Sequence, residues 1–371
     1  MIRKIGATLL LLCMTVTLPM TGWAAGAKTE IQIVKSAIDH ELVRPQSDGA
    51  FHDGLLFSQL ANGERVYYNT KGVPAFQLPP GVKAVSDFRE QRAIVKDTTT
   101  ERYGYINTQG KLVIPCEYAE VAPFSEGIAH VKDVDGHEFF VDRVGAVQVT
   151  LTTSYDSEYQ FAEGLAVAYA KPTGRLGYVN TKGELAIPYK YDYARSFSEG
   201  LALVGNDAGQ YGYINSKGKQ VIPFRYVSAG DFQEGLAPVQ NAAGKWGYIN
   251  KQGKTVIAHQ FADAWGFSEG LAAVFNKNRQ VGYINSAGKL VIGYQKYNSA
   301  EGFSQGIARV GIVSKNNPSG TYGYIDRQGR LLTKLEYTDG SSSFERGYAV
   351  AVKDDKGYIL AKSVSNSTGK K

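Results

Sequence analysis

Two short motifs alternate along most of the chain, and their regular spacing constrains the fold more than any other feature. One motif is Gly-Tyr-Ile-Asn, with glycine three residues after the asparagine, and the other is Phe-x-x-Gly-x-Ala-x-Val. The first motif begins at Val66, Gly104, Phe139, Gly177, Gly212, Gly247, Gly282, Gly323 and Gly357, and the second at Phe51, Phe88, Phe124, Phe161, Phe197, Phe232, Phe267, Phe303 and Phe344. A period of about 36 residues indicates a repeat protein whose units bury their apolar faces against one another.

The copy over residues 232–266 illustrates how one unit is expected to fold. Its alternating pattern predicts three short strands: Leu236–Gln240, Lys245–Asn250 and Thr255–Ile257. Asn250 and Gly253 predict a tight turn between the last two strands. The asparagine side chain can bond the turn backbone, and glycine tolerates a positive φ.

A three-stranded unit of this size buries too little apolar surface to be stable alone. Stacking solves this problem, because each large apolar side chain buried between units contributes roughly 1.5–3 kcal/mol. We therefore expect an all-β tandem array of about nine three-stranded repeats. Leu360 and Ser363 break the turn signature in the last copy, and divergent end copies are typical of caps. This favours an open twisted solenoid, with a closed β-propeller as the alternative.

The N-terminus has the pattern of a cleaved signal peptide over residues 1–27. Arg3 and Lys4 precede an apolar core from Ile5 to Leu18, and Ala25-Gly26-Ala27 provides a small-x-small cleavage site. The pattern predicts a protein that is secreted or located in the cell envelope. No other segment is long and apolar enough to predict a membrane-spanning helix.

The rest of the chain is expected to form one array without internal domain boundaries. Residues 28–50 read as a polar N-terminal lead-in, residues 51–360 as the repeat array, and residues 361–371 as a flexible tail rich in Ser, Lys and Asn. The net charge of +6 is mild and does not favour nucleic acid as a partner.

One cysteine remains after removal of the predicted signal peptide, so an intramolecular disulfide is excluded. Cys116 occupies the repeat position that holds Tyr189, Phe224 and His259 in other units. We therefore interpret it as a packing residue of the repeat and not as a nucleophile.

The best-preserved unit carries a family resemblance. The run from Lys245 to Asn250, followed by Gly253-Lys254 and preceded by Phe-x-Glu-Gly-Leu-Ala, resembles the bacterial WG repeat, also called the KWG repeat, over residues 51–360. The tryptophan before glycine is kept only at Trp246; the other units have Tyr103, Leu176, Tyr211, Val281, Tyr322 and Lys356. The resemblance implies a β-rich array in a bacterial, often exported, protein, and it implies no defined catalytic activity.

Residues that could carry chemistry do not form a catalytic pattern. The histidines are scattered over different repeat positions: His40, His52, His130, His137 and His259. Asp133-Val134-Asp135-Gly136 has a weak likeness to a calcium loop, but a hairpin turn is the favoured interpretation. We therefore predict no catalytic, cofactor-binding or metal-binding residue and no enzyme activity, and the ligand-binding residues remain open.

Two residue types recur at fixed repeat positions. The glutamates of the Ser-Glu-Gly element are expected to cap a turn or to form a charged strip along one edge: Glu126, Glu163, Glu199, Glu234 and Glu269. The tyrosines are expected to be core residues, although an exposed row of aromatics could also bind sugars or cations: Tyr105, Tyr178, Tyr213, Tyr248, Tyr283 and Tyr324.

These observations favour an exported, non-catalytic binding or scaffold protein of the cell envelope or exterior. Its repeat surface is expected to engage a protein or a cell-wall polysaccharide. The alternatives are a structural spacer without a specific ligand, or an enzyme whose site is assembled from loops distant in sequence.

Overall fold

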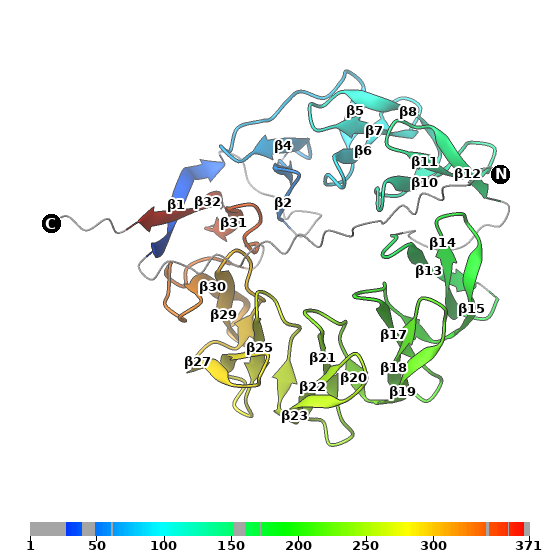
Figure 1. Ribbon diagram of the computed structural model, residues 1–371. Coiled ribbons are helices and arrows are strands. Elements are labelled where there is room, and N and C mark those ends of the chain that lie inside the picture. The colour runs from blue at the N-terminus through cyan, green and yellow to red at the C-terminus, as the bar shows by residue number, and fades with distance from the viewer. Residues whose placement is uncertain are drawn as a thin grey trace, which may run out of the picture.

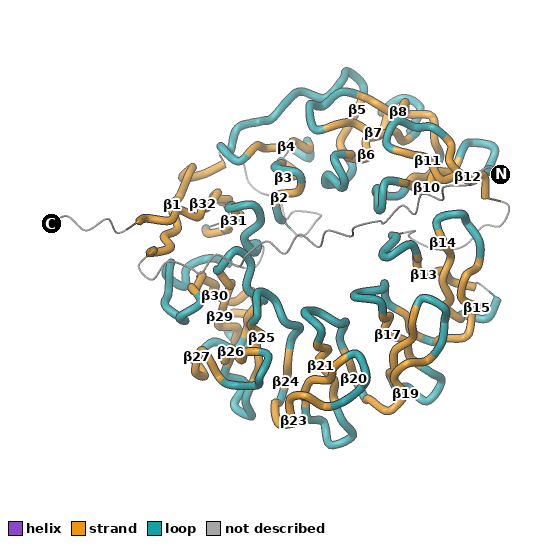
Figure 2. The backbone as a smooth tube through the Cα atoms, in the orientation of Figure 1, coloured by secondary structure: helices purple, strands orange, loops and turns teal. Residues whose placement is uncertain are grey.

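The computed structural model describes residues 27–38, 49–60, 62–151, 160–170, 172–338, 341–354 and 356–366. The predicted signal peptide lies outside these residues, apart from Ala27. All regular elements of the described residues are strands, which Figure 2 shows in orange between teal loops. Accordingly, no helix in this part of the chain could cross a membrane.

The strands form nine sheets, here called blades 1 to 9 in chain order. Blade 1 contains β2 (Phe51–His52), β3 (Leu55–Gln59) and β4 (Arg65–Asn69). Blade 2 contains β5 (Val82–Ala84), β6 (Arg92–Asp97), β7 (Tyr103–Asn107) and β8 (Leu112–Tyr118). Blade 3 contains β9 (Glu120–Val121), β10 (Ile128–Lys132), β11 (Glu138–Asp142) and β12 (Val147–Leu151). Blade 4 contains β13 (Leu165–Ala170), β14 (Arg175–Asn180) and β15 (Leu185–Tyr191).

The second half of the chain continues the same pattern. Blade 5 contains β16 (Tyr193–Ala194), β17 (Leu201–Gly205), β18 (Tyr211–Asn215) and β19 (Gln220–Tyr226). Blade 6 contains β20 (Ser228–Ala229), β21 (Leu236–Gln240), β22 (Trp246–Asn250) and β23 (Thr255–Phe261). Blade 7 contains β24 (Asp263–Ala264), β25 (Leu271–Phe275), β26 (Val281–Asn285) and β27 (Leu290–Gln295). Blade 8 contains β28 (Ser299–Ala300), β29 (Ile307–Ser314) and β30 (Asn317–Asp326), and blade 9 contains β31 (Tyr348–Lys353), β32 (Lys356–Asn366) and β1 (Ala27–Ile38).

The blades stand side by side around a central axis and form a closed ring (Figure 1). Blade 9 closes the ring, because it combines strands from both ends of the chain. β1 pairs antiparallel with β32, from Ala27 opposite Asn366 to Ile38 opposite Gly357. The fold is therefore a nine-bladed β-propeller, and the expectation of an open solenoid is wrong.

The missing turn signature in the last unit has a different cause from the one expected. Because Leu360 and Ser363 replace the turn residues, the chain does not turn back there, and β32 runs on to Asn366. The N-terminal strand then supplies the outer strand that the last unit cannot make for itself. Part of the predicted lead-in and part of the predicted flexible tail thus belong to blade 9.

The individual unit agrees with the sequence pattern and adds one strand to it. In blade 6, β21 and β22 match the first two predicted strands, and β23 extends the third one to Phe261. The turn after β22 is closed by a hydrogen bond from Gly253 N to Asn250 O of 2.8 Å. The Asn250 side chain also accepts the amides of Gln252 and Lys254. The segment that leads into the next unit forms a further short strand in most blades, and five of the nine sheets are four-stranded.

The glycine of the Gly-Tyr-Ile-Asn motif is required by a close approach of backbone. A Cβ added to Gly247 would lie 2.6 Å from the carbonyl oxygen of Ile257 in the outer strand. The two strands change register at this glycine, between Trp246 and Tyr248, and again between Tyr248 and Ile249. The resulting bulge brings the outer backbone over the glycine.

The repeated tyrosines are core residues, as expected. Tyr248 is buried, and its ring packs edge-on against Phe267 of the next blade, with centroids 5.0 Å apart. Its hydroxyl donates a 2.7 Å hydrogen bond to Trp265 O, so the polar end is satisfied. Burial raises the pKa of Tyr248 well above its usual range. Equivalent tyrosine–phenylalanine contacts join other neighbouring blades at Tyr67, Tyr105, Tyr178, Tyr213, Tyr283 and Tyr324.

In blades 2 to 7, the repeated glutamates connect each blade to the next. Glu234 has a φ of 54° and forms a two-residue hairpin turn with Gly235. Its carboxylate accepts a hydrogen bond of 2.9 Å from Gly270 N, at the equivalent turn of blade 7. The same contact occurs from Glu90, Glu126, Glu163, Glu199 and Glu269. The predicted turn position is thus correct, and the carboxylates also link neighbouring units.

Candidate functional site

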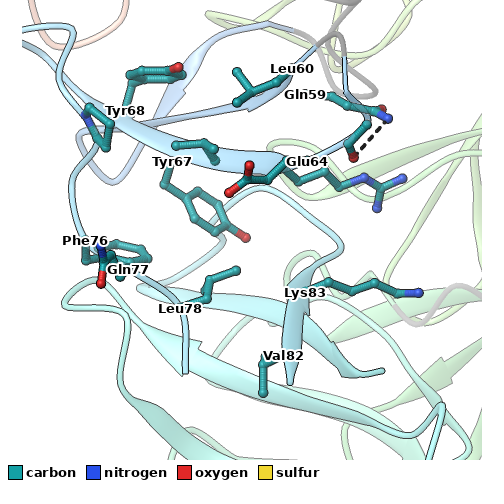
Figure 3. A pocket seen from close by; sticks show the side chains of 14 residues that line it. Gln59, Leu60, Glu64, Tyr67, Tyr68, Phe76, Gln77, Leu78, Val82 and Lys83 are labelled. Atoms are coloured by element: carbon teal, nitrogen blue, oxygen red, sulfur yellow. Dashed lines mark hydrogen bonds between the residues drawn. The ribbon is translucent and has the colours of Figure 1, made fainter. Parts of the chain in front are cut away.

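Blade 1 departs from the repeat and contains a pocket of about 790 Å³ at its outer edge. Figure 3 shows the side chains that line it. They come from β4 and the turn before it, from the segment after β4, and from the start of β5 in blade 2. The lining residues are Gln59, Leu60, Gly63, Glu64, Arg65, Val66, Tyr67, Tyr68, Pro74, Phe76, Gln77, Leu78, Val82 and Lys83.

The pocket exists because blade 1 has no regular outer strand. After the turn at residues 69–72, the chain contacts β4 through the bridge between Tyr68 and Pro74 and a 2.8 Å hydrogen bond from Ala75 N to Tyr67 O. Pro79 and Pro80 follow, and neither has an amide hydrogen to continue a ladder. The segment therefore leaves the sheet, and the pocket opens beside β4.

The pocket has an apolar interior and a charged rim. Tyr67 is buried, and its hydroxyl donates to Ser86 O at 2.7 Å, while burial raises the pKa of the phenol. Phe76 packs on the Tyr67 ring, with centroids 5.4 Å apart. The charged residues of the lining are Glu64, Arg65 and Lys83. This combination of surfaces suits an amphipathic group that places its apolar part inside and its polar part at the rim.

The pocket lining does not combine the groups of an acid–base or nucleophilic site. It contains one carboxylate, Glu64, and no histidine, cysteine, serine or aspartate. Tyr67 is held as a neutral hydrogen-bond donor by its burial. The lining can therefore bind and orient a group, and Glu64 stands in it without a serine, cysteine or histidine beside it.

Cys116 lies partly buried and packs against the cluster between blades 1 and 2. Burial raises the pKa of its thiol, which disfavours the reactive thiolate. This environment fits a packing residue, as interpreted from the repeat.

The described histidines lie in three blades: His52 in blade 1, His130 and His137 in blade 3, and His259 in blade 6. His130 Nε2 is 3.1 Å from Glu138 Oε2 in blade 3, and His52 Nδ1 is 3.7 Å from Glu345 Oε2 at the junction of blades 9 and 1. His40 lies outside the described residues. The structure therefore does not gather the described histidines into one site.

The weak calcium-like run is a hairpin turn in the structure. The Asp133 carboxylate accepts the amides of Asp135 and His137 at 2.9 and 2.8 Å, and Asp133 O accepts Gly136 N at 3.3 Å. Side-chain ligand atoms of Asp133, Asp135 and His137 lie within 4.8 Å of one another. The Asp133 carboxylate is already hydrogen-bonded to the amides of the turn. The turn therefore explains why these three side chains lie close together.

The residues of the blade 1 pocket were not singled out in the sequence. The available indication was the Pro79-Pro80 pair in place of the outer strand of the repeat. A proline pair argues against a paired strand, but it does not reveal that the chain leaves a pocket behind.

Fold and pocket together define the class of protein: a nine-bladed β-propeller with a pocket in an incomplete blade. The family pattern described as WG containing repeat matches residues 103–136, 177–208, 211–245, 246–279, 282–312 and 322–356. These matches cover more than half of the sequence, and the chain belongs to the WG-repeat family.

Solved structures are similar in fold at very low sequence identity. The eukaryotic initiation factor is 12% identical with a TM-score of 0.52, and the match covers 84% of this chain and 95% of that chain. BamB from Moraxella catarrhalis is 11% identical with a TM-score of 0.42, over 78% of this chain and 96% of that chain. Such likenesses concern the fold alone. No curated protein matches the sequence.

Proposed function

We propose that the protein is an exported, non-catalytic scaffold that binds a partner protein through its propeller surface. A cell-wall polysaccharide is the second partner to test, and a spacer without a specific ligand is the alternative. The observation that carries the proposal is the blade 1 pocket, which breaks an otherwise regular repeat and combines apolar and charged side chains. The charged start, apolar core and cleavage pattern of residues 1–27 support export.

The contrast between constant and variable repeat positions also supports a binding role. The tyrosine that packs between blades recurs in most units, whereas the residue two positions before it varies in size and charge. That position holds Tyr103, Leu176, Tyr211, Trp246, Val281, Tyr322 and Lys356. Val281 and Tyr322 are buried at this position, and the side chains of the other units are partly or fully exposed there. Where they are exposed, the ring presents a different contact surface from blade to blade over a constant core.

An affinity experiment tests the proposal. The mature protein, immobilised, is incubated with culture and envelope proteins and, separately, with isolated cell wall. We expect a specific protein to be retained, and we expect less retention by Glu64→Lys and Lys83→Glu, which change the pocket rim. Lys217→Glu, on the turn after β18, is the matched control.

Three outcomes would contradict the proposal in different ways. Retention on cell wall alone would assign a polysaccharide ligand, and retention of neither material would favour the spacer. Equal retention by the rim variants and the control would remove the blade 1 pocket from the binding surface.

A further inference from the structure

A second pocket contains both tryptophans that follow the predicted signal peptide. The sequence has three tryptophans, and one of them, Trp23, lies within residues 1–27. The other two, Trp246 and Trp265, line a pocket of about 450 Å³ formed by blades 5, 6 and 7. The pocket is distinct from the one in blade 1, and no residue is shared between the two.

Trp265 is held in place although its side chain is 52% exposed. Its amide donates to Ala273 O at 3.0 Å, and its carbonyl accepts the Tyr248 hydroxyl at 2.7 Å. The indole also contacts the Phe275 ring edge-on, with centroids 6.5 Å apart. The backbone of Trp265 is thus fixed, and the exposed indole, which contacts Phe275, lines the pocket where a ligand can pack against it.

The repeat itself does not require an aromatic residue at this position. Trp265 lies two residues before the repeated phenylalanine of blade 7. The neighbouring units have Arg195, Gly230 and Glu301 at this position. The tryptophan is therefore a property of this pocket and not of the blade architecture.

The charged groups of the pocket give it an excess of negative charge. Asp231 and Asp263 face one cation, Arg195, whose Nη2 is 3.0 Å from Asp231 Oδ2. The other oxygen, Asp231 Oδ1, is buried and has no hydrogen-bond partner among the described residues. Asp263 Oδ1 accepts only its neighbour's amide, Ala264 N, at 2.9 Å within the described part of the chain. The remaining acceptor capacity of Asp263 and of Asp231 Oδ2 suits a ligand with N–H donors, and the buried unpartnered Oδ1 keeps the Asp231 carboxylate short of hydrogen bonds from the protein.

We propose that this pocket binds an ammonium or guanidinium group, with the cation against the indole of Trp265 and its N–H groups directed to Asp231 and Asp263. Indole faces attract cations, and carboxylates hydrogen-bond them with strong directional preference. The pocket volume is in the range of sites that hold a small ligand or one long side chain. A lysine or arginine side chain of a partner protein and a free organic amine share this chemistry. The first source rests on the proposed binding function.

Intrinsic fluorescence tests the assignment, because both tryptophans of the mature protein line the pocket. Tetra-arginine peptide is titrated at low ionic strength, in parallel with N-acetylargininamide, tetraglutamate and chitotetraose. We expect a saturable fluorescence change with the two cationic probes only. Tighter binding of the peptide assigns a polypeptide partner, and equal affinity per cation assigns a free amine.

Substitutions then locate the binding site by calorimetry, which does not depend on the fluorophore. We expect Asp263→Asn and Trp265→Ala each to weaken tetra-arginine binding about tenfold or more, which corresponds to about 1.4 kcal/mol. Asp135→Asn, an exposed aspartate of blade 3, is the matched control and keeps the parent affinity. Circular dichroism confirms that each variant is folded.

Absence of tetra-arginine binding, binding that both pocket variants leave unchanged, or preferential binding of chitotetraose would overturn the assignment. These results are separable from a failure of the proposed function. A partner protein retained in the affinity experiment by a chain that binds no cation would reject this pocket alone.

Discussion

Arg346 and Asp53 face each other across the junction of blades 9 and 1, with Arg346 Nη2 3.6 Å from Asp53 Oδ1. Both residues occupy the turn position that holds glutamate in most other blades. In most other blades, the glutamate at this position accepts a hydrogen bond from a backbone amide of the next blade. Asp53 does the same and accepts a hydrogen bond of 2.7 Å from Gln91 N. At the closing junction the last unit instead contributes a cation, so the two divergent ends are complementary to each other.

Reversing the charge of Arg346 should weaken the closure of the ring. Arg346→Glu would place a third carboxylate beside Asp53 and Glu345, and we expect the free energy of unfolding to fall by about 1 kcal/mol. The loss should shrink at high salt, because the site is partly exposed and is screened. Urea unfolding at low and high salt measures the loss in the free energy of unfolding, with Lys217→Glu as the control. An equal effect of both substitutions would exclude a specific role of the junction.

The inter-blade glutamates should stabilise the fold despite their unfavourable backbone conformation. Glu234→Gly relieves a positive φ, worth about 1 kcal/mol, but removes a charge-assisted hydrogen bond worth about 1.5–3 kcal/mol. We expect a net loss of roughly 1 kcal/mol. Arg279→Gly is the matched control, since Arg279 has a φ of 58° in a turn where Gly209 and Gly244 stand in neighbouring blades. The control should gain stability in thermal unfolding, and a gain in both variants would refute the prediction.

Two glycines at different repeat positions should respond oppositely to alanine. Gly247→Ala places a methyl group 2.6 Å from Ile257 O, and we expect a loss of about 1–3 kcal/mol because backbone must shift. A Cβ on Gly293 has no atom within 4 Å, and other units have Pro115, Pro188, Pro223 or Ala258 there. Gly293→Ala should therefore be neutral or slightly stabilising. Chemical unfolding of both variants measures the difference, and equal losses would contradict the bulge geometry.

The free energy of unfolding should decrease as the pH falls, because His130 becomes protonated. Burial lowers the pKa of His130 below its usual 6.5, with a small contribution in the same direction from Lys132 and against the opposing effects of Glu138 and Glu120. The folded state therefore favours the neutral ring, and this contribution to stability is present above about pH 6.5 and is lost as the pH falls toward the lowered value. His130→Gln should show a shallower pH dependence of unfolding between about pH 7 and pH 5.

The control for this prediction is His137→Gln, whose side chain is 68% exposed. It removes an exposed imidazole of the same blade, so the two variants together separate the effect of burial from the mere loss of a histidine. An NMR titration that places the pKa of His130 at or above 6.5 would contradict the argument.

Local features of the fold were predictable because they depend on residues close in sequence. The hairpin over β22 and β23 follows from alternation and from Asn250 and Gly253, and the buried position of Tyr248 follows from its recurrence. The all-β repeat class and the WG-repeat family were likewise predicted from the motifs and are confirmed.

Closure was not predictable from the same patterns, because it depends on a pairing between the two ends of the chain. Ser363 Oγ donates to Glu30 O at 3.3 Å across a separation of 333 residues. The break at Leu360 was interpreted as a cap, although it also marks a unit without an outer strand. The pockets share this difficulty, since each joins side chains from different blades, such as Glu64 with Lys83 and Trp246 with Trp265.

The pairing of β1 with β32 sets the order in which the molecule can be completed. β1 is synthesised before the other strands of the propeller and its partner β32 is synthesised last. β1 therefore cannot pair until nearly the whole chain has been made. During that interval the edge of β1 is open, and so is the edge of blade 1 that will meet blade 9. Closure of the ring is then a slow step, because β1 and β32 are far apart in sequence. Bringing such distant segments together costs more chain entropy than forming local contacts.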